Sequence, residues 1–124
     1  MLGTESTATS KVEALRAASY SAGANNGPWI SAPGFEGVLV FAYNVGALTG
    51  SVIFSLEDAT DGSGTGAAAL SAAVASASLT TAGTSGALIC PKKKIRSHVR
   101  LVATVTTGPC LAAAILLSRP KTTA

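Results

Sequence analysis

Apolar and polar residues alternate over residues 95–117, and this is the strongest structural signal in the chain. A period of two is typical of a β-strand with one buried face. The segment contains two alternating runs, separated by Thr107, Gly108 and Pro109, which favour a chain reversal. The pattern therefore predicts a β-hairpin at the centre of a sheet. The residues predicted to share its apolar face are Val99, Leu101, Ala103 and Val105 in the first strand and Leu111, Ala113, Ile115 and Leu117 in the second.

A second pair of strands is predicted upstream. Residues 35–47 form a continuous apolar, β-branched and aromatic run, which is typical of a central strand buried on both faces. Residues 51–57 then alternate again, after a turn-forming segment that begins at Gly46 and ends at Gly50. We therefore predict a second hairpin, so that the two hairpins together supply four strands.

Four further segments give weaker signals. Residues 11–20 fit a helical period and a strand period about equally, and we interpret them as a strand. Residues 21–34 have the Gly, Pro and Asn content of a loop, whereas residues 87–90 fit a short strand that Pro91 ends. Residues 67–77 are rich in Ala and Ser, and either a short helix or a small-residue strand fits them.

These elements predict an all-β protein, a single-domain antiparallel β-sandwich that is jelly-roll-like, with at most one short helix in the Ala-rich segment. A chain of 124 residues suits one domain. We expect the sandwich to span residues 11–118, preceded by a flexible N-terminal arm over residues 1–10 and followed by a C-terminal tail over residues 119–124.

The charge content changes this picture, because it suggests an assembly. Only 12% of the residues are charged, whereas about a quarter are charged in an average soluble domain. All six acids precede residue 62, and all bases except Lys11 and Arg16 follow it. Two interpretations stay open: oppositely charged halves make subunits meet or dock on an acidic surface, or the two halves fold together and their charges mix on one surface.

The compartment follows from what the sequence lacks. No stretch approaches the roughly 18 consecutive apolar residues of a membrane span, and the polar N-terminus has no apolar signal-peptide core. We therefore expect a protein made in the cytoplasm, with no membrane partner. In that compartment Cys90 and Cys110 are expected to be reduced, buried thiols rather than a disulfide.

Two motifs near the middle of the chain resemble ligand sites. Residues 62–67, GSGTGA, formally satisfy the dinucleotide pattern, but that fingerprint needs an acid about 20 positions later and none follows Asp61. A flexible hairpin loop is the better interpretation. The carboxylates of Glu57, Asp58 and Asp61 could hold a hard cation, but their spacing does not match an EF-hand, and solvated turn acids are favoured.

The sequence contains few residues that could form a catalytic site. The chain has one histidine, His98, so counting excludes a His-rich metal site. A Cys-His site would need His98 with Cys90 or Cys110, and no nucleophile signature surrounds any of them. We predict that the protein is not an enzyme, with no catalytic or metal-binding residues and no cofactor.

The sequence does contain residues that could bind a partner. Lys92–Lys94 and Arg96 form a basic cluster, but no aromatic residue follows Phe54, and single-stranded nucleic acid usually stacks on aromatics. We therefore expect no direct nucleic-acid binding, and either docking on an acidic protein surface or a solvated turn. The single Trp29 either anchors its loop to the core or is exposed as a contact residue. The candidate partner-binding residues are Trp29, Lys92, Lys93, Lys94 and Arg96.

The order of segments over about residues 34–121 resembles a group of small structural proteins encoded by tailed bacteriophages. The resemblance rests on turn and strand patterns and marks no catalytic site. The Ala-rich residues 67–77 depart from it. The residues that carry the resemblance are Asn44-Val45-Gly46 with Thr49-Gly50, Glu57-Asp58 with Asp61-Gly62-Ser63, Leu79-Thr80-Thr81, the run RSHVRLVATVT from Arg96 to Thr106, and the closing apolar strand before Arg119-Pro120.

Members of such groups are head decoration (cement) proteins or other minor virion proteins, with β-sandwich folds and often trimeric assembly. The resemblance implies a viral structural protein that binds the major capsid protein on the outer surface of a phage head. It also implies a homotrimer located in the virion. The alternative is a minor structural component of the tail, neck or baseplate.

Overall fold

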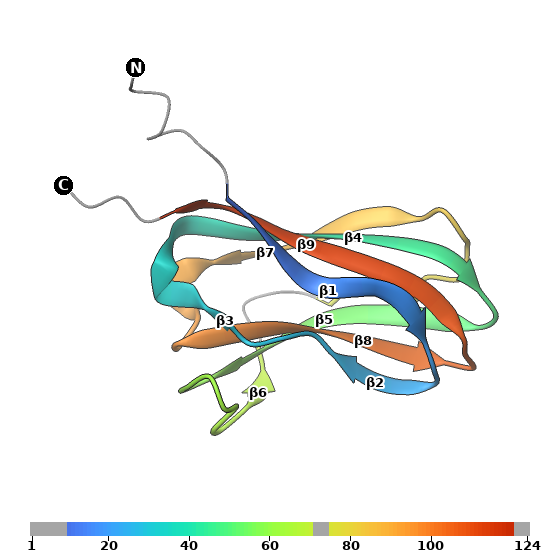
Figure 1. The fold of residues 1–124 in the computed structure, drawn as a ribbon, viewed down its shortest axis with the longest axis horizontal. Helices are drawn as coiled ribbons and strands as arrows, with labels where there is room; N and C mark the ends of the chain where they lie inside the picture. Colours follow the sequence, from blue (N-terminus) through green and yellow to red (C-terminus); the bar gives the residue numbers. More distant parts are fainter. Residues whose placement is uncertain (1–9, 71–74, 121–124) are drawn as a thin grey trace, which may run out of the picture.

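The computed structural model describes residues 10–70 and 75–120, which fold into two antiparallel sheets packed face to face (Figure 1). Short 3-10 turns, η2 (Ala32–Gly34) and η3 (Lys92–Lys94), connect strands at one end of the sandwich. Sheet A has the strand order β1 (Ser10–Tyr20), β9 (Cys110–Pro120), β4 (Phe35–Leu48) and β7 (Ser85–Pro91). Sheet B has the order β2 (Gly23–Asn26), β8 (His98–Thr106), β5 (Ser51–Ala59) and β6 (Ala68–Ala69), with β3 (Ile30–Ser31) also paired to β8.

The strand pairing is that of a jelly roll. β2 and β3 behave as one interrupted strand, because both pair antiparallel with β8 and the Gly27 N–H between them donates to the Leu101 carbonyl at 2.8 Å. Counted in this way, the pairs are nested: β1 with β9, β2/β3 with β8, β4 with β7, and β5 with β6. Wrapping such a nested ribbon into two sheets gives the jelly roll. The predicted all-β, jelly-roll-like sandwich is confirmed.

Both predicted hairpins are wrong, although their four strands are present. β8 lies in sheet B and β9 in sheet A, and β4 and β5 are divided between the sheets in the same way. The turns at residues 107–109 and 49–50 therefore cross from one sheet to the other, and the ladders β4–β9 and β5–β8 join strands that are distant in sequence. Alternation and a short turn occur in a hairpin and in an inter-sheet crossing alike, so the local pattern does not distinguish them.

The core lies between the sheets and takes one side of every long strand. On β8 the predicted apolar face is confirmed, because its four residues are at most 3% exposed. Across the core, the rings of Tyr43 on β4 and Phe54 on β5 stack with their centroids 4.4 Å apart. The core members of these strands are Ala14 and Leu15 of β1, Phe35, Leu39, Phe41 and Val45 of β4, Val52, Phe54 and Leu56 of β5, Leu88 and Cys90 of β7, Val99, Leu101, Ala103 and Val105 of β8, and Cys110, Ala112, Ala114 and Leu116 of β9.

On β4 and β9 the predicted burial is wrong. β4 was expected to be buried on both faces, but its outward side is open, with Val38 46% exposed. On β9 the predicted core parity is reversed, because Leu116 is fully buried while Leu111 and Ile115 are 45% and 40% exposed. Both faces of β9 are apolar, so alternation alone could not choose between them.

The weaker predictions had mixed outcomes. Residues 11–20 are confirmed as a strand, and the short strand predicted over residues 87–90 is confirmed as part of β7. The loop predicted over residues 21–34 is wrong in part, because β2 and β3 complete the ladder of β8 there. The described part of the Ala-rich segment contains β6 and no helix, while residues 71–74 lie outside the described residues. The predicted arm also lies outside them, apart from Ser10.

The two cysteines are free and buried, as predicted. Cys90 lies opposite Leu39 of β4, and Cys110 lies opposite Leu48 of the same strand. At about 3.3 Å per residue, these positions are roughly 30 Å apart, far beyond the roughly 7 Å that a disulfide allows between Cα atoms. Burial raises the pKa of both thiols.

Candidate partner-binding surfaces

The basic turn Lys92–Lys94 lies at the end of the sandwich where β1 begins and β9 ends (Figure 1). Pro91 ends β7, and the Ile95 N–H donates to the Lys92 carbonyl at 3.0 Å, which closes the 3-10 turn. Ile95 is buried and fixes the turn to the core, while Lys93 and Lys94 are exposed and Lys92 is half-buried. No ion pair among the described residues involves these three lysines.

A hollow of about 520 Å³ adjoins this turn. Its walls come from the start of β4 and the end of β7, which lie side by side because Val38 pairs with Pro91. The hollow therefore combines apolar wall residues with two lysines of the turn and with the acid Glu36. The lining residues are Phe35, Glu36, Gly37, Val38, Pro91, Lys92 and Lys93.

The Arg96 side chain already forms hydrogen bonds to groups of its own chain. Its Nη2 donates to the Asp58 carboxylate at 2.9 Å, to the Asp58 carbonyl at 2.8 Å and to the Gly66 carbonyl at 2.8 Å. Burial alone would raise the pKa of Asp58, but hydrogen bonds from the Arg96 side chain and backbone outweigh it and hold the pKa below its usual range. Arg96 therefore fastens the 60–67 loop to β5, and its role toward a partner stays a prediction.

The 60–67 loop is a hairpin loop, as predicted for the glycine-rich motif. It joins β5 to β6, which pair antiparallel, so the element that directly follows the loop is a strand. The Asp61 carboxylate accepts hydrogen bonds from the Thr65 side chain and the Thr65 and Ser63 backbones, and these bonds lower its pKa. Gly64 and Gly66 have φ of 85° and 67°, values that favour glycine.

The acids near this loop have separate partners. The carboxylates of Asp58 and Asp61 are occupied as described above, and Glu57 pairs with Arg100 at 2.7 Å between Oε1 and Nη2. Within residues 10–70 and 75–120, no group of three potential metal-ligating side chains is present. His98 Nδ1 lies 2.8 Å from the Ser97 hydroxyl.

Trp29 lies on the outer side of sheet B and does not belong to the core cluster. The Arg100 guanidinium carbon stands 4.3 Å from the centroid of its ring, a cation–π contact. The indole edge also adjoins the backbone of Gly64, where an added Cβ would come within 2.9 Å of Trp29 Nε1. The structure thus places Trp29 and Arg96 against one loop, and the three lysines on the neighbouring turn.

Sequence reasoning missed a second surface, on the outer side of sheet A. We call it the apolar face. It includes four of the five large apolar side chains exposed in the described residues, and Ile89 is the most open of them at 58%. The signal that could have found it is the absence of any polar residue from 111 to 117. The apolar face consists of Val38, Val40 and Ala42 of β4, Ala87 and Ile89 of β7, and Leu111, Ala113, Ile115 and Leu117 of β9.

No protein-family model and no curated protein matches the chain. A solved structure that matches is that of the Gx strain of infectious bursal disease virus, with 14% sequence identity and a TM-score of 0.36. The match covers 93% of this chain and 37% of that chain, so this chain spans little more than a third of the viral protein's length. In the part of the chain that the structure describes, no helix has the length and apolar character needed to cross a membrane.

Proposed function

We propose that this chain is a non-enzymatic structural protein of a virion, a decoration protein that binds the outer surface of a tailed-phage head. In this function it clamps neighbouring major capsid subunits. The observation that carries the proposal is the basic turn Lys92–Lys94, placed beside an apolar hollow at one end of a jelly roll. The resemblance of the sequence to small phage structural proteins supplies the class of partner.

The electrostatics support an acidic docking surface. Arg96 and Arg100 are paired with acids of the same chain, whereas the basic turn has no acid within ion-pair distance among the described residues. Its charge is therefore available to a partner of opposite sign, which would steer the encounter and fix the orientation. The adjoining hollow offers apolar area that a docking segment would bury.

A homotrimer suits this function. Three-fold positions of a capsid lattice present three equivalent docking sites, and linking three weak contacts raises the overall affinity without new chemistry. The low charge content of 12% supports an assembled state, because an assembly removes uncharged surface from water.

The test is replacement of Lys92, Lys93 and Lys94 together by Glu. Exposed ion pairs contribute about 0.5 kcal/mol each, so losing three weakens binding to stripped capsids about tenfold, and reversing the charge weakens it further. Rising salt should reduce the difference from wild type, because salt screens exposed charges. Binding is measured by co-sedimentation with stripped capsids at several salt concentrations.

The matched control replaces the same three lysines by Arg, which keeps the charge and should bind like wild type. Circular dichroism of both variants checks that the β-sandwich is retained. Equal binding of the Glu variant and wild type at low salt would refute the role of the turn. Recovery of the protein only in purified tails would refute the capsid assignment and support the tail alternative.

A further inference from the structure

We propose that the partner docks on the free edge of β7, and that its docking segment is an extended strand of a major capsid subunit with acidic residues at one end. The proposal rests on the proposed function and names the part of the partner that reaches the basic turn. Among the described residues, β7 is the last strand of sheet A and pairs only with β4. Its final residue, Pro91, leads directly into Lys92–Lys94, so the strand edge and the basic turn form one continuous surface.

The backbone of β7 offers hydrogen-bonding groups along this edge. In an antiparallel ladder, successive residues direct their N–H and C=O groups alternately to the two sides of the strand. On the β7 side of β4, the Val45 N–H donates to the Thr84 carbonyl at 2.9 Å. On the β9 side, the Val38 carbonyl accepts from the Ser118 hydroxyl at 3.1 Å. The odd-numbered residues of β4 therefore bond to the even-numbered residues of β7. The residues of β7 that direct their backbone groups away from β4 are Ser85, Ala87, Ile89 and Pro91.

This edge lacks the features that usually protect an edge strand. No backbone hydrogen bond among the described residues engages the outward N–H and C=O groups of β7. The strand has no charged residue, its register with β4 runs without a shift, and its one proline is the last residue. A regular, uncharged edge is a template for one more strand.

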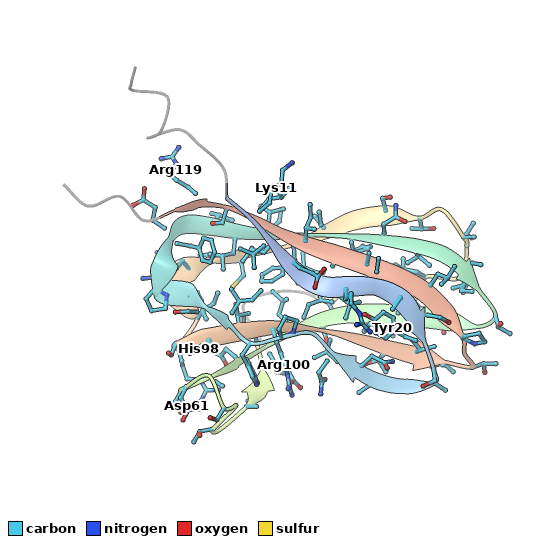
Figure 2. The ribbon with its side chains drawn as sticks, in the orientation of Figure 1. Lys11, Tyr20, Asp61, His98, Arg100 and Arg119 are labelled. Carbon is cyan, nitrogen blue, oxygen red and sulfur yellow. The ribbon has the colours of Figure 1, made fainter. Side chains whose placement is uncertain are left out.

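The other edges are shorter, irregular or covered. β1, at the opposite side of sheet A, has Lys11, Glu13 and Arg16 and two register shifts. Figure 2 shows Lys11 projecting outward near the start of that strand. On sheet B, β6 and the Ser76 N–H, which donates to the Phe54 carbonyl at 2.9 Å, cover the free side of β5. The edge strands on the other side of sheet B, β2 and β3, have only four and two residues. In the part of the chain that the structure describes, β7 is therefore the edge best suited to strand addition.

The side chains beside this edge define what the added strand must present. Ser85 at its start is polar and accepts a hydrogen bond from the Asn44 amide at 2.8 Å. Ala87 and Ile89 follow on the apolar face, and Ile89 is 58% exposed. An added strand places alternate side chains beside these positions. A complementary segment is therefore polar at one end and has small or apolar residues at alternate positions in its middle.

The basic turn defines the other end of the segment. Lys93 and Lys94 are exposed, and no lysine of the turn forms an ion pair among the described residues. Glu36 lines the same hollow as Lys92 and Lys93, but one acid against three lysines leaves this end of β7 net positive. The end of the segment beside Pro91 is therefore acidic, because opposite charges steer and orient docking.

A second copy of this chain does not meet these requirements. Pairing β7 antiparallel with the β7 of another copy places the basic turn of one beside the Ser85 end of the other. No acid follows Asp61 in the sequence, so neither β7 nor its flanking turns contain a carboxylate to meet the lysines. The β1 edge is interrupted by its register shifts. The occupant that fits is an extended segment of the partner.

The first experiment blocks the edge while keeping β7. Ala87→Pro removes an outward N–H and places a ring where the added strand would lie, and Pro91 already occupies an outward position of the same strand. Binding to stripped capsids should weaken at least about tenfold, because backbone hydrogen bonds to the added strand are lost. Rising salt should leave this ratio to wild type unchanged, since salt screens charges and not neutral hydrogen bonds. The matched control Ala87→Val keeps the N–H and should bind like wild type.

The second experiment uses the wild-type protein, so it tests the proposal even if Ala87→Pro disturbs folding. Hydrogen–deuterium exchange with mass spectrometry compares the free protein with the protein bound to stripped capsids. Amides of the peptide that contains Ala87 and Ile89 should exchange at least about tenfold more slowly in the bound state, because they gain acceptors in the added strand. β2, an edge strand of the other sheet, is the internal control and should keep its exchange rate.

Equal capsid binding by a folded Ala87→Pro variant and wild type, or equal exchange of β7 in the free and bound states, would overturn the proposal. The proposed function would survive that result if the triple lysine-to-Glu variant still bound more weakly than wild type. A wild-type protein that does not bind capsids would overturn both. A fall in the mass of the free protein on Ala87→Pro, measured by sedimentation equilibrium, would identify a second copy as the occupant and overturn the assignment to a capsid segment.

Discussion

The two sheets share one core but differ on their outer sides. On sheet B, Arg100 forms an ion pair with Glu57 and stacks over Trp29, so the charges of Arg100 and Glu57 are paired within the chain. On sheet A, apolar side chains face outward and the bordering Lys11 and Glu13 have no ion-pair partner among the described residues. The same jelly roll thus has one side completed by its own residues and one side suited to contact with another molecule.

The largest effect should come from testing which side of β9 faces the core. Leu116 is fully buried, so Leu116→Ala should lower the free energy of unfolding by about 2–5 kcal/mol through lost burial and a new cavity. The adjacent Leu117 faces outward, and Leu117→Ala should cost below about 1 kcal/mol. Urea unfolding at low protein concentration measures both, because association would add apparent stability. A larger loss of unfolding free energy for Leu117→Ala than for Leu116→Ala would mean that Leu117 faces the core, as the sequence pattern predicted.

The reversal on β9 shows how far the sequence could predict this fold. Alternation located β5, β8 and β9, a continuous apolar run located β4, and weaker signals located β1 and β7. Alternation could not fix the facing of β9, since Leu111–Leu117 has no polar position to mark the solvent side. It also could not assign strands to sheets, because β4 pairs with β9 more than 60 residues later, and such pairing depends on the whole core.

The candidate site was predictable to a similar degree. The basic turn was visible as a run of lysines ended by a buried Ile95, since local sequence is enough to make a turn. The pairing of Arg96 with Asp58 was not, because 38 residues separate them and only the β5–β8 register brings them together. The sequence left two interpretations of the charge asymmetry open. Mixing of charges on one surface holds for the ion pairs Asp58–Arg96 and Glu57–Arg100, because each joins an acid of the first half to a base of the second half.

That ion pair provides the second prediction. The Asp58 side chain is 8% exposed, and Asp58→Asn removes the charge that Arg96 binds, so we expect a loss of about 1–3 kcal/mol in the free energy of unfolding. The control Glu57→Gln concerns a pair whose side chains are 30% and 21% exposed, and it should cost below about 1 kcal/mol. Chemical denaturation at pH 7 compares the two. Equal losses would mean that burial of Asp58 adds nothing.

The pH dependence has a definite sign. The pKa of Asp58 is lowered in the folded state, so its contribution is present above the ordinary carboxyl pKa of about 4 and is lost as the pH falls through the folded value. The stability difference between wild type and Asp58→Asn should therefore shrink from pH 7 toward pH 3. A difference that stays constant over this range would show that the carboxylate charge is not the cause.

The smallest effect concerns the outer side of sheet B. Arg100→Gln removes a cation–π contact with Trp29 and a partly exposed ion pair with Glu57. Each contributes about 0.5 kcal/mol at such a site, so the free energy of unfolding should fall by about 1 kcal/mol. Trp29 is the single tryptophan, so its fluorescence reports this contact directly. Water replacing the guanidinium should shift its emission to longer wavelength.

The control for this change is Arg16→Gln, which removes an exposed base from β1 in sheet A, away from Trp29. It should leave both the emission maximum and the unfolding midpoint close to wild type, because isolated surface charges contribute little. If Arg100→Gln also leaves the emission unchanged, the guanidinium does not cover the indole in solution. The outer side of sheet B would then have an uncovered Trp29. It would differ from the outer side of sheet A only in that its charged residues form ion pairs.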